Sequence, residues 1–205
     1  MLFTDAIDHV TIVLLKKLQK LSSLQSTRLV GGTALALQIG HRKSVDLDLF
    51  GSVESNQIDL NEDLRGITDS MTLLQDSRNI HIYLLNQVKV DIVNYSYKWL
   101  KEPVQQEDLV LASIEDIAAM KIAAVVGRGT KKDFIDLAFL LDYFPFKDIM
   151  SMYMEKYPEA SMFVAMKSLT YFQDAEKDAM PNMLIPVSWQ ACKDKLYSAV
   201  RKFTK

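Results

Sequence analysis

The sequence LVGGTALALQIGHRKSVDLDLF, at residues 29–50, joins a glycine pair, an apolar segment and an alternating acidic segment. Residues 45–49 alternate apolar and acidic side chains, a period of two that is typical of a strand with one buried face. Leu29 and Val30 lead into Gly31–Gly32, and an apolar stretch follows at residues 33–39. This order predicts a short strand, a tight glycine turn, a short helix and a second strand.

Two carboxylates of the predicted second strand suggest a site for a cation. Asp46 and Asp48 are two residues apart, so both project from one face of a strand. Carboxylates held so close repel each other unless water or a cation lies between them. Mg²⁺ prefers oxygen ligands and needs only one or two carboxylates in addition to substrate phosphates. The alternative interpretation is that Asp46 and Asp48 form the solvated face of an edge strand.

A third acidic residue lies in a predicted hairpin. The apolar segments 80–85 and 88–95 are separated only by Asn86–Gln87, which predicts two antiparallel strands. Asp91 interrupts the second of these segments; taken alone, such a residue is more often a solvated strand residue. If its strand lies beside residues 45–49, three carboxylates converge and could hold two ions for phosphoryl transfer.

The glycine pair strengthens this interpretation. Glycine lets the backbone approach a ligand closely, and a helix that begins directly after Gly31–Gly32 offers its first N–H groups to a phosphate. A plain tight turn explains the glycines equally well when they are considered alone. The glycines and the acidic strand together are a stronger signal than either one.

Composition places the chain in the ordinary globular class. It has 205 residues, of which 49% are hydrophobic and 24% charged, and a formal net charge of -2. The near-neutral charge argues against a protein that coats nucleic acid, although it leaves room for a local basic groove. Cys192 is the single cysteine, which excludes an internal disulfide. No apolar run approaches the roughly 20 residues of a membrane span, so no membrane contact is expected. The single cysteine, and an N-terminal segment that is acidic where a signal peptide is basic, predict a cytoplasmic protein.

The rest of the chain divides into two halves. Apolar residues at helical spacing predict a first helix with Ile7, Val10, Leu14, Leu18 and Leu21 on one face, and the region from about residue 52 to 67 opens a second helical stretch. The polar run 105–108 after Pro103 predicts a boundary. Capping-box patterns begin at Ser113 and Thr130, and further helices are predicted near 147–157, 160–172 and 188–203. A mixed α/β half over 1–104 is therefore expected before a helical half over 105–205.

The sequence from Leu29 to Phe50 resembles the first motif of the AbiEii-type nucleotidyltransferase toxins, which belong to the DNA polymerase beta-like nucleotidyltransferase superfamily. The resemblance implies an α+β fold: a small mixed-sheet nucleotidyltransferase domain at 1–104, and a helical domain at 105–205 that completes the active-site cleft. It also implies a metal site formed by Asp46, Asp48 and Asp91. The nucleotide would contact Gly31, Gly32, Thr33, Arg42 and Ser44. His41, beside Arg42, is expected on a surface turn.

A second motif lies in the helical half. Lys121 falls within the apolar face of its helix, where it could either extend its ammonium to water or face a cleft and meet a phosphate. The segment around Lys121, followed by RGTKKDFIDL at residues 128–137, is similar to the second motif of the same family. The resemblance implies that Lys121 and Asp136 belong to the active site and that Arg128 contacts phosphate. Asp133 also fits as the third residue of the capping box that Thr130 begins, so Asp136 is the preferred site residue.

The function expected from this resemblance is Mg²⁺-dependent transfer of a nucleoside monophosphate (NMP) from a nucleoside triphosphate (NTP) to an acceptor hydroxyl. The acceptor implied by the family is RNA, at the 3′ end of tRNA, and the role is that of a toxin in a toxin–antitoxin or phage-defence system with a cognate antitoxin. A small-molecule acceptor such as an antibiotic is the alternative reaction. A non-catalytic module that binds nucleotide or a partner is the alternative class. Basic residues of the C-terminal helix could contact RNA or simply be solvated: Lys193, Lys195, Arg201, Lys202 and Lys205.

Overall fold

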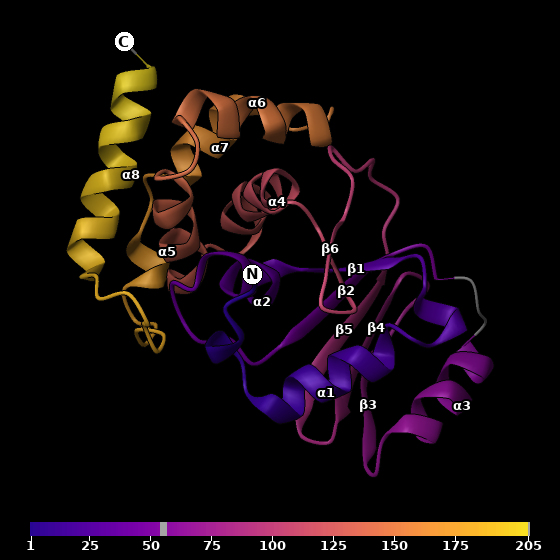
Figure 1. Cartoon of the computed structure of the whole chain (residues 1–205). Helices are drawn as coiled ribbons and strands as arrows, with labels where there is room; N and C mark the ends of the chain where they lie inside the picture. Colours follow the sequence, from indigo (N-terminus) through magenta and orange to yellow (C-terminus); the bar gives the residue numbers. More distant parts are fainter. Residues whose placement is uncertain (54–56, 205) are drawn as a thin grey trace. The chain divides into compact units, whose positions relative to one another are not determined.

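The structure, a computed structural model, describes residues 1–53 and 57–204 and contains two compact units (Figure 1). The first unit comprises Met1–Ser96 and Glu102–Ala112, and the second comprises Tyr97–Lys101 and Ser113–Lys205. The chain therefore passes between the units three times: after Ser96, after Lys101 and after Ala112. Each unit consists of two separate stretches of sequence.

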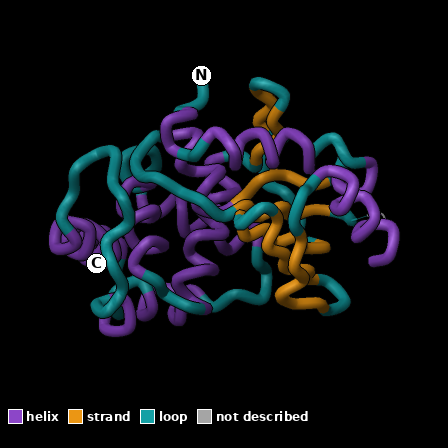
Figure 2. Tube along the Cα trace, turned by 90° about the horizontal axis from the view of Figure 1, so that it is seen from below, coloured by secondary structure: helices purple, strands orange, loops and turns teal. Residues whose placement is uncertain are grey.

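The first unit contains a mixed β-sheet, seen as the orange strands of Figure 2. Within the described residues its seven strands have the order β3-β4-β5-β2-β1-β7-β6. The central strand β2 is antiparallel to β1 and parallel to β5, and β1 is parallel to β7. The strands are β1 (Thr27–Val30), β2 (Leu47–Gly51), β3 (Met71–Asp76), β4 (Ile80–Leu85), β5 (Val88–Asn94), β6 (Val104–Gln106) and β7 (Leu109–Leu111). The mixed sheet confirms the predicted α+β class.

The apolar periodicity predicted the helices of the first unit only in part, since Ile7 and Leu21 lie outside the first α-helix. The unit contains η1 (Thr4–Ala6), α1 (His9–Leu18), η2 (Ser22–Leu24), α2 (Gly31–Ile39) and α3 (Gln57–Ile67). Leu14 and Leu18 of α1 are buried as predicted, but Val10 is 62% exposed. Val10 lies in the first turn of α1, and the expectation that it shares the buried face was wrong. Residues 54–56 of the predicted helical stretch lie outside the described residues.

The hairpin predicted at residues 80–95 is present, with Asn86–Gln87 as its turn. Strands β4 and β5 pair antiparallel from Ile80↔Val93 to Leu85↔Val88. Asn86 and Gln87 form the two-residue turn with φ of 47° and 68°. The carboxamide oxygen of Asn86 accepts hydrogen bonds from the backbone N–H groups of Asp69 and Ser70, each at 3.0 Å. The turn therefore also fixes the start of β3, a strand that the sequence analysis did not predict.

Two short strands continue the sheet beyond residue 104, where the helical half was expected to begin. β6 and β7 form a hairpin whose turn residues Glu107 and Asp108 both have positive φ. β7 pairs with β1, and the N–H of Ala112 donates to the carbonyl of Leu29 at 2.9 Å. Strands of three residues are too short to show a period of two, so the polar run at 105–108 resembled a linker.

The second unit is helical. It contains α4 (Ile114–Gly127), α5 (Lys131–Leu140), α6 (Phe146–Lys156), α7 (Met162–Ser168), η3 (Gln173–Ala175) and α8 (Trp189–Phe203). Ser113 caps α4 by accepting a hydrogen bond from the N–H of Asp116 at 3.0 Å. The hydroxyl of Thr130 instead donates to the carboxylate of Asp133 at 2.6 Å and does not cap α5. Only the first of the two predicted capping patterns is therefore confirmed.

A buried ion pair anchors the short segment Tyr97–Lys101 in the helical unit. Lys156 lies 2.7 Å from Asp116, and both side chains are fully buried. The carboxylate of Asp116 also accepts hydrogen bonds from the N–H groups of Leu100 and Lys101, at 2.9 and 3.1 Å. Lys156 donates to the carbonyl of Lys98 at 3.0 Å and lies 4.5 Å from the ring centre of Trp99. The pair therefore connects α4, α6 and the anchored segment.

Candidate active site

The predicted acidic strand lies in the middle of the sheet. In the strand register, Asp48 of β2 is opposite Val30 of β1 on one side and Asp91 of β5 on the other. Neighbours in register project from the same face of a sheet, so the Asp48 and Asp91 carboxylates share a face. The alternating residues Leu47 and Leu49 are fully buried. The solvated edge-strand interpretation was therefore wrong, because β2 is a central strand.

Both glycines of the turn are in contact with predicted site residues. Gly31 has a φ of +70°, and a Cβ at this position would overlap the Asp48 carboxylate. A Cβ on Gly32 would overlap the Arg42 guanidinium. The absence of side chains therefore lets one acidic and one basic group lie directly against the first residues of α2. The plain-turn interpretation does not explain these two contacts.

The segment before β2 is attached to α2 through hydroxyl groups. The hydroxyl of Thr33 donates to the backbone carbonyl of Asp46 and lies 2.8 Å from the hydroxyl of Ser44. The N–H of Ser44 donates to the carbonyl of Ala6 at 2.9 Å. Thr33 and Ser44 thus position Asp46 in this structure. His41, expected on a surface turn, is fully buried, so that expectation was wrong.

Asp91 has a cationic neighbour that the sequence analysis missed. The ammonium of Lys89 donates to both oxygens of Asp91, at 2.6 and 2.7 Å. Lys89 and Asp91 are two residues apart on β5 and therefore project from one face. The segment VKVDIV at residues 88–93 contained this signal, but Asp91 was considered as a lone acid.

The donor set matches Mg²⁺ in chemical type, because Asp46, Asp48 and Asp91 supply carboxylate oxygens. Among residues 1–53 and 57–204, no three His, Cys, Asp or Glu side chains are gathered into a group that could hold a metal ion. Asp91 is paired with Lys89, and the Asp48 carboxylate lies against Gly31. Asp46 and Asp48 are enough for an ion whose remaining ligands come from water and substrate phosphates.

The second motif forms a buried charge cluster in the helical unit. The ammonium of Lys121 lies 2.9 Å from Asp133 and 2.6 Å from Asp136, and its side chain is only 4% exposed. Both carboxylates are fully buried. The interpretation in which Lys121 extends its ammonium to water was therefore wrong. Asp133 contacts Lys121 just as Asp136 does, and the shared helix face of these two acids was the available signal.

Arg128 joins this cluster to the surface. Its Nε and Nη2 donate to Asp133 at 3.0 and 3.2 Å, while 60% of its side chain is exposed. Burial favours a raised pKa for Asp133, but Lys121, Arg128 and Thr130 together hold that pKa well below its usual value. Arg128 also lines a cavity of about 380 Å³ in the same unit, together with Lys167 and Tyr171.

The basic residues of α8 are partly neutralised. Lys193 lies 2.7 Å from Glu176, and Lys195 lies 2.7 Å from Asp142. Lys205 lies outside the described residues. The helix therefore presents less net positive charge than its sequence suggests.

Comparison with known proteins identifies the class. The structure is similar to that of a Helicobacter pylori protein assigned as a nucleotidyltransferase, with a TM-score of 0.61 at 18% identity over 96% of this chain and 97% of that chain. It is also similar to MenT4, a nucleotidyltransferase toxin from Mycobacterium tuberculosis H37Rv. That match has a TM-score of 0.54 at 16% identity and covers 92% of this chain and 80% of that chain. The fold is that of the nucleotidyltransferases.

The sequence defines the family within this class. The family description "Nucleotidyl transferase AbiEii toxin, Type IV TA system" matches residues 13–204. An uncharacterized protein from Aquifex aeolicus (strain VF5) is 35% identical over 176 residues, which cover 80% of this chain and 82% of that protein. The chain belongs to the AbiEii nucleotidyltransferase toxin family. It is a nucleotidyltransferase, and the family implies an NTP substrate and a cognate antitoxin.

Across the described residues, no helix combines the length and apolar character needed to cross a membrane.

Proposed function

We propose that the protein transfers an NMP from an NTP to a terminal hydroxyl of RNA, at the 3′ end of tRNA, in a Mg²⁺-dependent reaction. The observation that carries this proposal is Asp48, which lies against Gly31 and beside Asp91 in the register of a central sheet. RNA as acceptor rests on the family resemblance. Such an activity suits a toxin of a phage-defence system, because a nucleotide added to the tRNA end blocks its use in translation.

The triphosphate is bound at the start of α2. Val30, which precedes the helix, makes no side-chain cap, and the first N–H groups of a helix favour an anion such as a phosphate. The guanidinium of Arg42 lies against Gly32 and adds positive charge at the same place. Together they bind and orient the phosphates.

The three carboxylates serve metal binding and proton transfer. Asp46 and Asp48 would hold Mg²⁺, which, when bound, neutralises charge on the phosphates and polarises them for attack. Once Lys89 moves away from it, Asp91 would complete the metal site or accept the proton of the attacking hydroxyl. The acceptor oxygen forms a bond to the α-phosphorus, the α–β phosphoanhydride bond breaks, and pyrophosphate leaves with the electron pair. The rate enhancement comes mainly from orientation and charge neutralisation.

A labelling experiment tests the reaction. The full-length protein is incubated with total tRNA, Mg²⁺ and each of the four α-labelled NTPs in turn, and the products are separated by gel electrophoresis. We expect labelled tRNA. In a parallel reaction with a cell extract in place of tRNA, label on a small molecule would support the antibiotic-type acceptor. Nucleotide binding without any labelled product would support a non-catalytic module. Either result contradicts the proposal.

Variants of the acidic strand test the chemistry. Asp48→Asn keeps the size of the side chain and removes its charge, and we expect at least about 100-fold less transfer, since one electrostatic group in a site contributes on this scale. Asp108→Asn is the matched control, because Asp108 lies in the β6–β7 turn and asparagine tolerates its positive φ. A folded Asp48→Asn protein with full activity would refute the role of this carboxylate.

The glycine turn provides an independent test. In Gly32→Ala the new methyl group displaces the Arg42 guanidinium, and we expect transfer to fall on the order of tenfold to a hundredfold, as for misplacement of a site group by about 1 Å. Gly66→Ala is the matched control, because nothing lies within 4 Å of a Cβ at Gly66. Equal activity of the two variants would show that Arg42 is not held in place for catalysis.

A further inference from the structure

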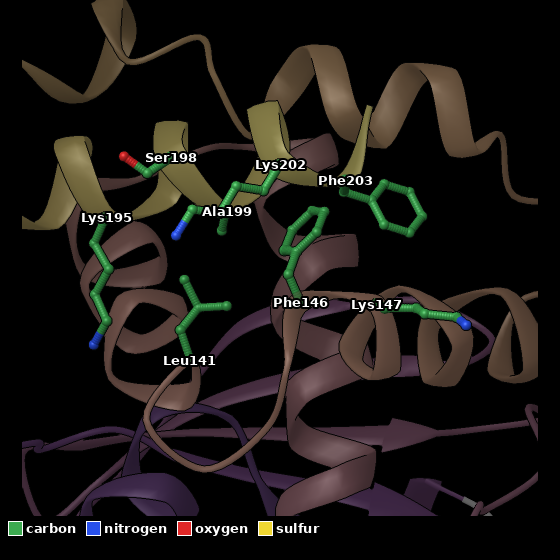
Figure 3. A pocket seen from close by; sticks show the side chains of 8 residues that line it. All are labelled: Leu141, Phe146, Lys147, Lys195, Ser198, Ala199, Lys202 and Phe203. Carbon is green, nitrogen blue, oxygen red and sulfur yellow. The ribbon is translucent and has the colours of Figure 1, made fainter. Parts of the chain in front are cut away.

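A groove of about 700 Å³ lies in the helical unit between α8 and two neighbouring parts of the chain, Leu141 directly after α5 and the first residues of α6 (Figure 3). None of the candidate active-site residues lines it. The lining residues are Leu141, Phe146, Lys147, Lys195, Ser198, Ala199, Lys202 and Phe203. The groove thus has no assigned role in nucleotide transfer.

Two different stripes of α8 explain why the groove exists. Cys192, Leu196 and Val200 are buried and attach the helix to the unit. The residues at 195, 198, 199 and 202 are spaced by three and four positions and form a second stripe along one side of the same helix. In Figure 3 Lys195 and Ala199 of this stripe lie on the side of α8 that faces Leu141 and Phe146. The helix therefore presents one face to the core and another to the groove.

The floor of the groove is apolar and well packed. It consists of Leu141, Phe146, Ala199 and Phe203, and the rings of Phe146 and Phe203 meet edge to face at 5.4 Å between centres. Phe146 is only 9% exposed, so its ring faces remain covered. The floor suits aliphatic side chains.

The rim of the groove is basic. Three lysines and no acidic residue line it. Lys195 forms an ion pair with Asp142, with 2.7 Å between the ammonium nitrogen and a carboxylate oxygen. Lys147 and Lys202 are exposed, and neither forms an ion pair with any residue in the described part of the chain. An apolar floor between unpaired ammonium groups is complementary to a segment that has one apolar face and flanking carboxylates.

We propose that this groove docks an acidic amphipathic helix of a partner protein. Apolar side chains at positions i, i+3, i+4 and i+7 of that helix occupy the floor, and its flanking carboxylates face Lys147 and Lys202. The surface is separate from the residues of the nucleotidyl-transfer proposal, so binding and transfer can be measured independently. The protein would then carry a docking surface for an acidic partner in addition to its catalytic site.

A designed peptide tests the proposal by fluorescence anisotropy with the full-length protein. The probe is a fluorescein-labelled helix of about 14 residues, roughly four turns, with leucine at the groove positions and glutamate elsewhere. A scrambled peptide of identical composition and a single-stranded RNA of equal charge are measured in parallel. We expect the amphipathic peptide to bind at least about tenfold more tightly than the scrambled one, a difference of about 1.4 kcal/mol.

Two lysine variants link binding to the groove. Lys147→Glu/Lys202→Glu reverses both rim charges, and we expect it to weaken peptide binding about tenfold. Lys20→Glu/Lys177→Glu makes the same change at exposed positions outside the groove and serves as the matched control. All four lysines are exposed, and thermal melting verifies that each variant is folded.

Three results would overturn the proposal. The first is a peptide affinity that neither scrambling nor the rim variant changes. The second is RNA binding that requires Lys147 and Lys202 in the absence of peptide binding, which would make the groove a nucleic-acid surface. The third is a self-association, detected by sedimentation, that the rim variant abolishes, which would make a second copy of the chain the occupant.

Discussion

Single side chains account for much of the candidate site. Asp48 and Arg42 reach the start of α2 only because Gly31 and Gly32 have no Cβ. Lys121 is enclosed by two carboxylates, whereas Lys89 remains 40% exposed beside its single partner Asp91. The two lysines are therefore expected to respond differently to substitution, because a partly exposed pair is weak and a buried pair leaves an uncompensated charge when it is broken.

Lys89→Gln is expected to lower the Mg²⁺ concentration required for half-maximal transfer by about twofold to fivefold, since a pair of this exposure contributes up to about 1 kcal/mol. The physical reason is competition, because the Lys89 ammonium occupies both Asp91 oxygens. Titration of activity with Mg²⁺ measures the effect, and Lys20→Gln is the control. An unchanged or raised Mg²⁺ requirement would show that Lys89 assists the site and does not compete at it.

Asp133→Asn is expected to lower the free energy of unfolding by about 3 kcal/mol near pH 7, because Lys121 and Arg128 lose a fully buried partner. The pKa of Asp133 is lowered in the folded state, so its contribution is complete above the ordinary value of 3.8 and declines as the pH falls toward the folded-state pKa. Urea unfolding at several pH values measures the difference. The gap between wild type and variant should narrow below pH 3.8; a constant gap would contradict the role assigned to the charge.

At the scale of elements, the turns determine how the sheet is assembled. Both two-residue hairpin turns, Asn86–Gln87 and Glu107–Asp108, have positive φ without a glycine. This conformation costs an ordinary L-residue roughly 1–2 kcal/mol, and glycine adopts it without that cost. The two turns join β4 to β5 and β6 to β7, and β5 and β7 are the strands that pair with β2 and β1, so the strained turns belong to the hairpins on either side of the β1–β2 pair.

Gln87→Gly is expected to raise the free energy of unfolding by about 0.5–1 kcal/mol, the relief of positive φ minus the entropy that glycine adds to the unfolded chain. Gln87 is exposed, so the substitution removes little packing. Gln25→Gly, at an exposed position with a φ of -59°, is the control and should destabilise. Thermal and urea unfolding of the three proteins make the comparison, and a less stable Gln87→Gly protein would exclude strain at this turn.

At the scale of the whole molecule, sequence patterns predicted what depends on local order and missed what depends on tertiary pairing. The alternation at 45–49 predicted a strand with Asp48 and buried leucines, and the two-residue gap at Asn86–Gln87 predicted a hairpin. Periodicity could not reveal three-residue strands, nor that the Asp133 carboxylate binds Lys121 in addition to the hydroxyl of Thr130. The pairing of Lys89 with Asp91 was visible as an i, i+2 spacing, but charge partners can be recognised only when both residues are considered together.

Lys156→Met is expected to lower the free energy of unfolding by about 3 kcal/mol, because it leaves the fully buried carboxylate of Asp116 without its cation. Hydrogen exchange should show earlier opening at Leu100 and Lys101, whose N–H groups bind that carboxylate. Lys177→Met, at an exposed position, is the control. Unaltered exchange at these two amides would mean that the segment is held by other contacts.

The interleaved path of the chain limits how this protein can be divided. Because Tyr97–Lys101 belongs to the helical unit while Glu102–Ala112 returns to the sheet, no single cut separates the units into intact modules. A fragment that ends at Ala112 retains residues 97–101 but loses Asp116 and Lys156, to which they are anchored. Recombination between relatives at one crossover would likewise combine an anchored segment from one parent with the anchor of the other. The topology therefore requires residues 97–156 to stay together for the anchored segment to keep its partners.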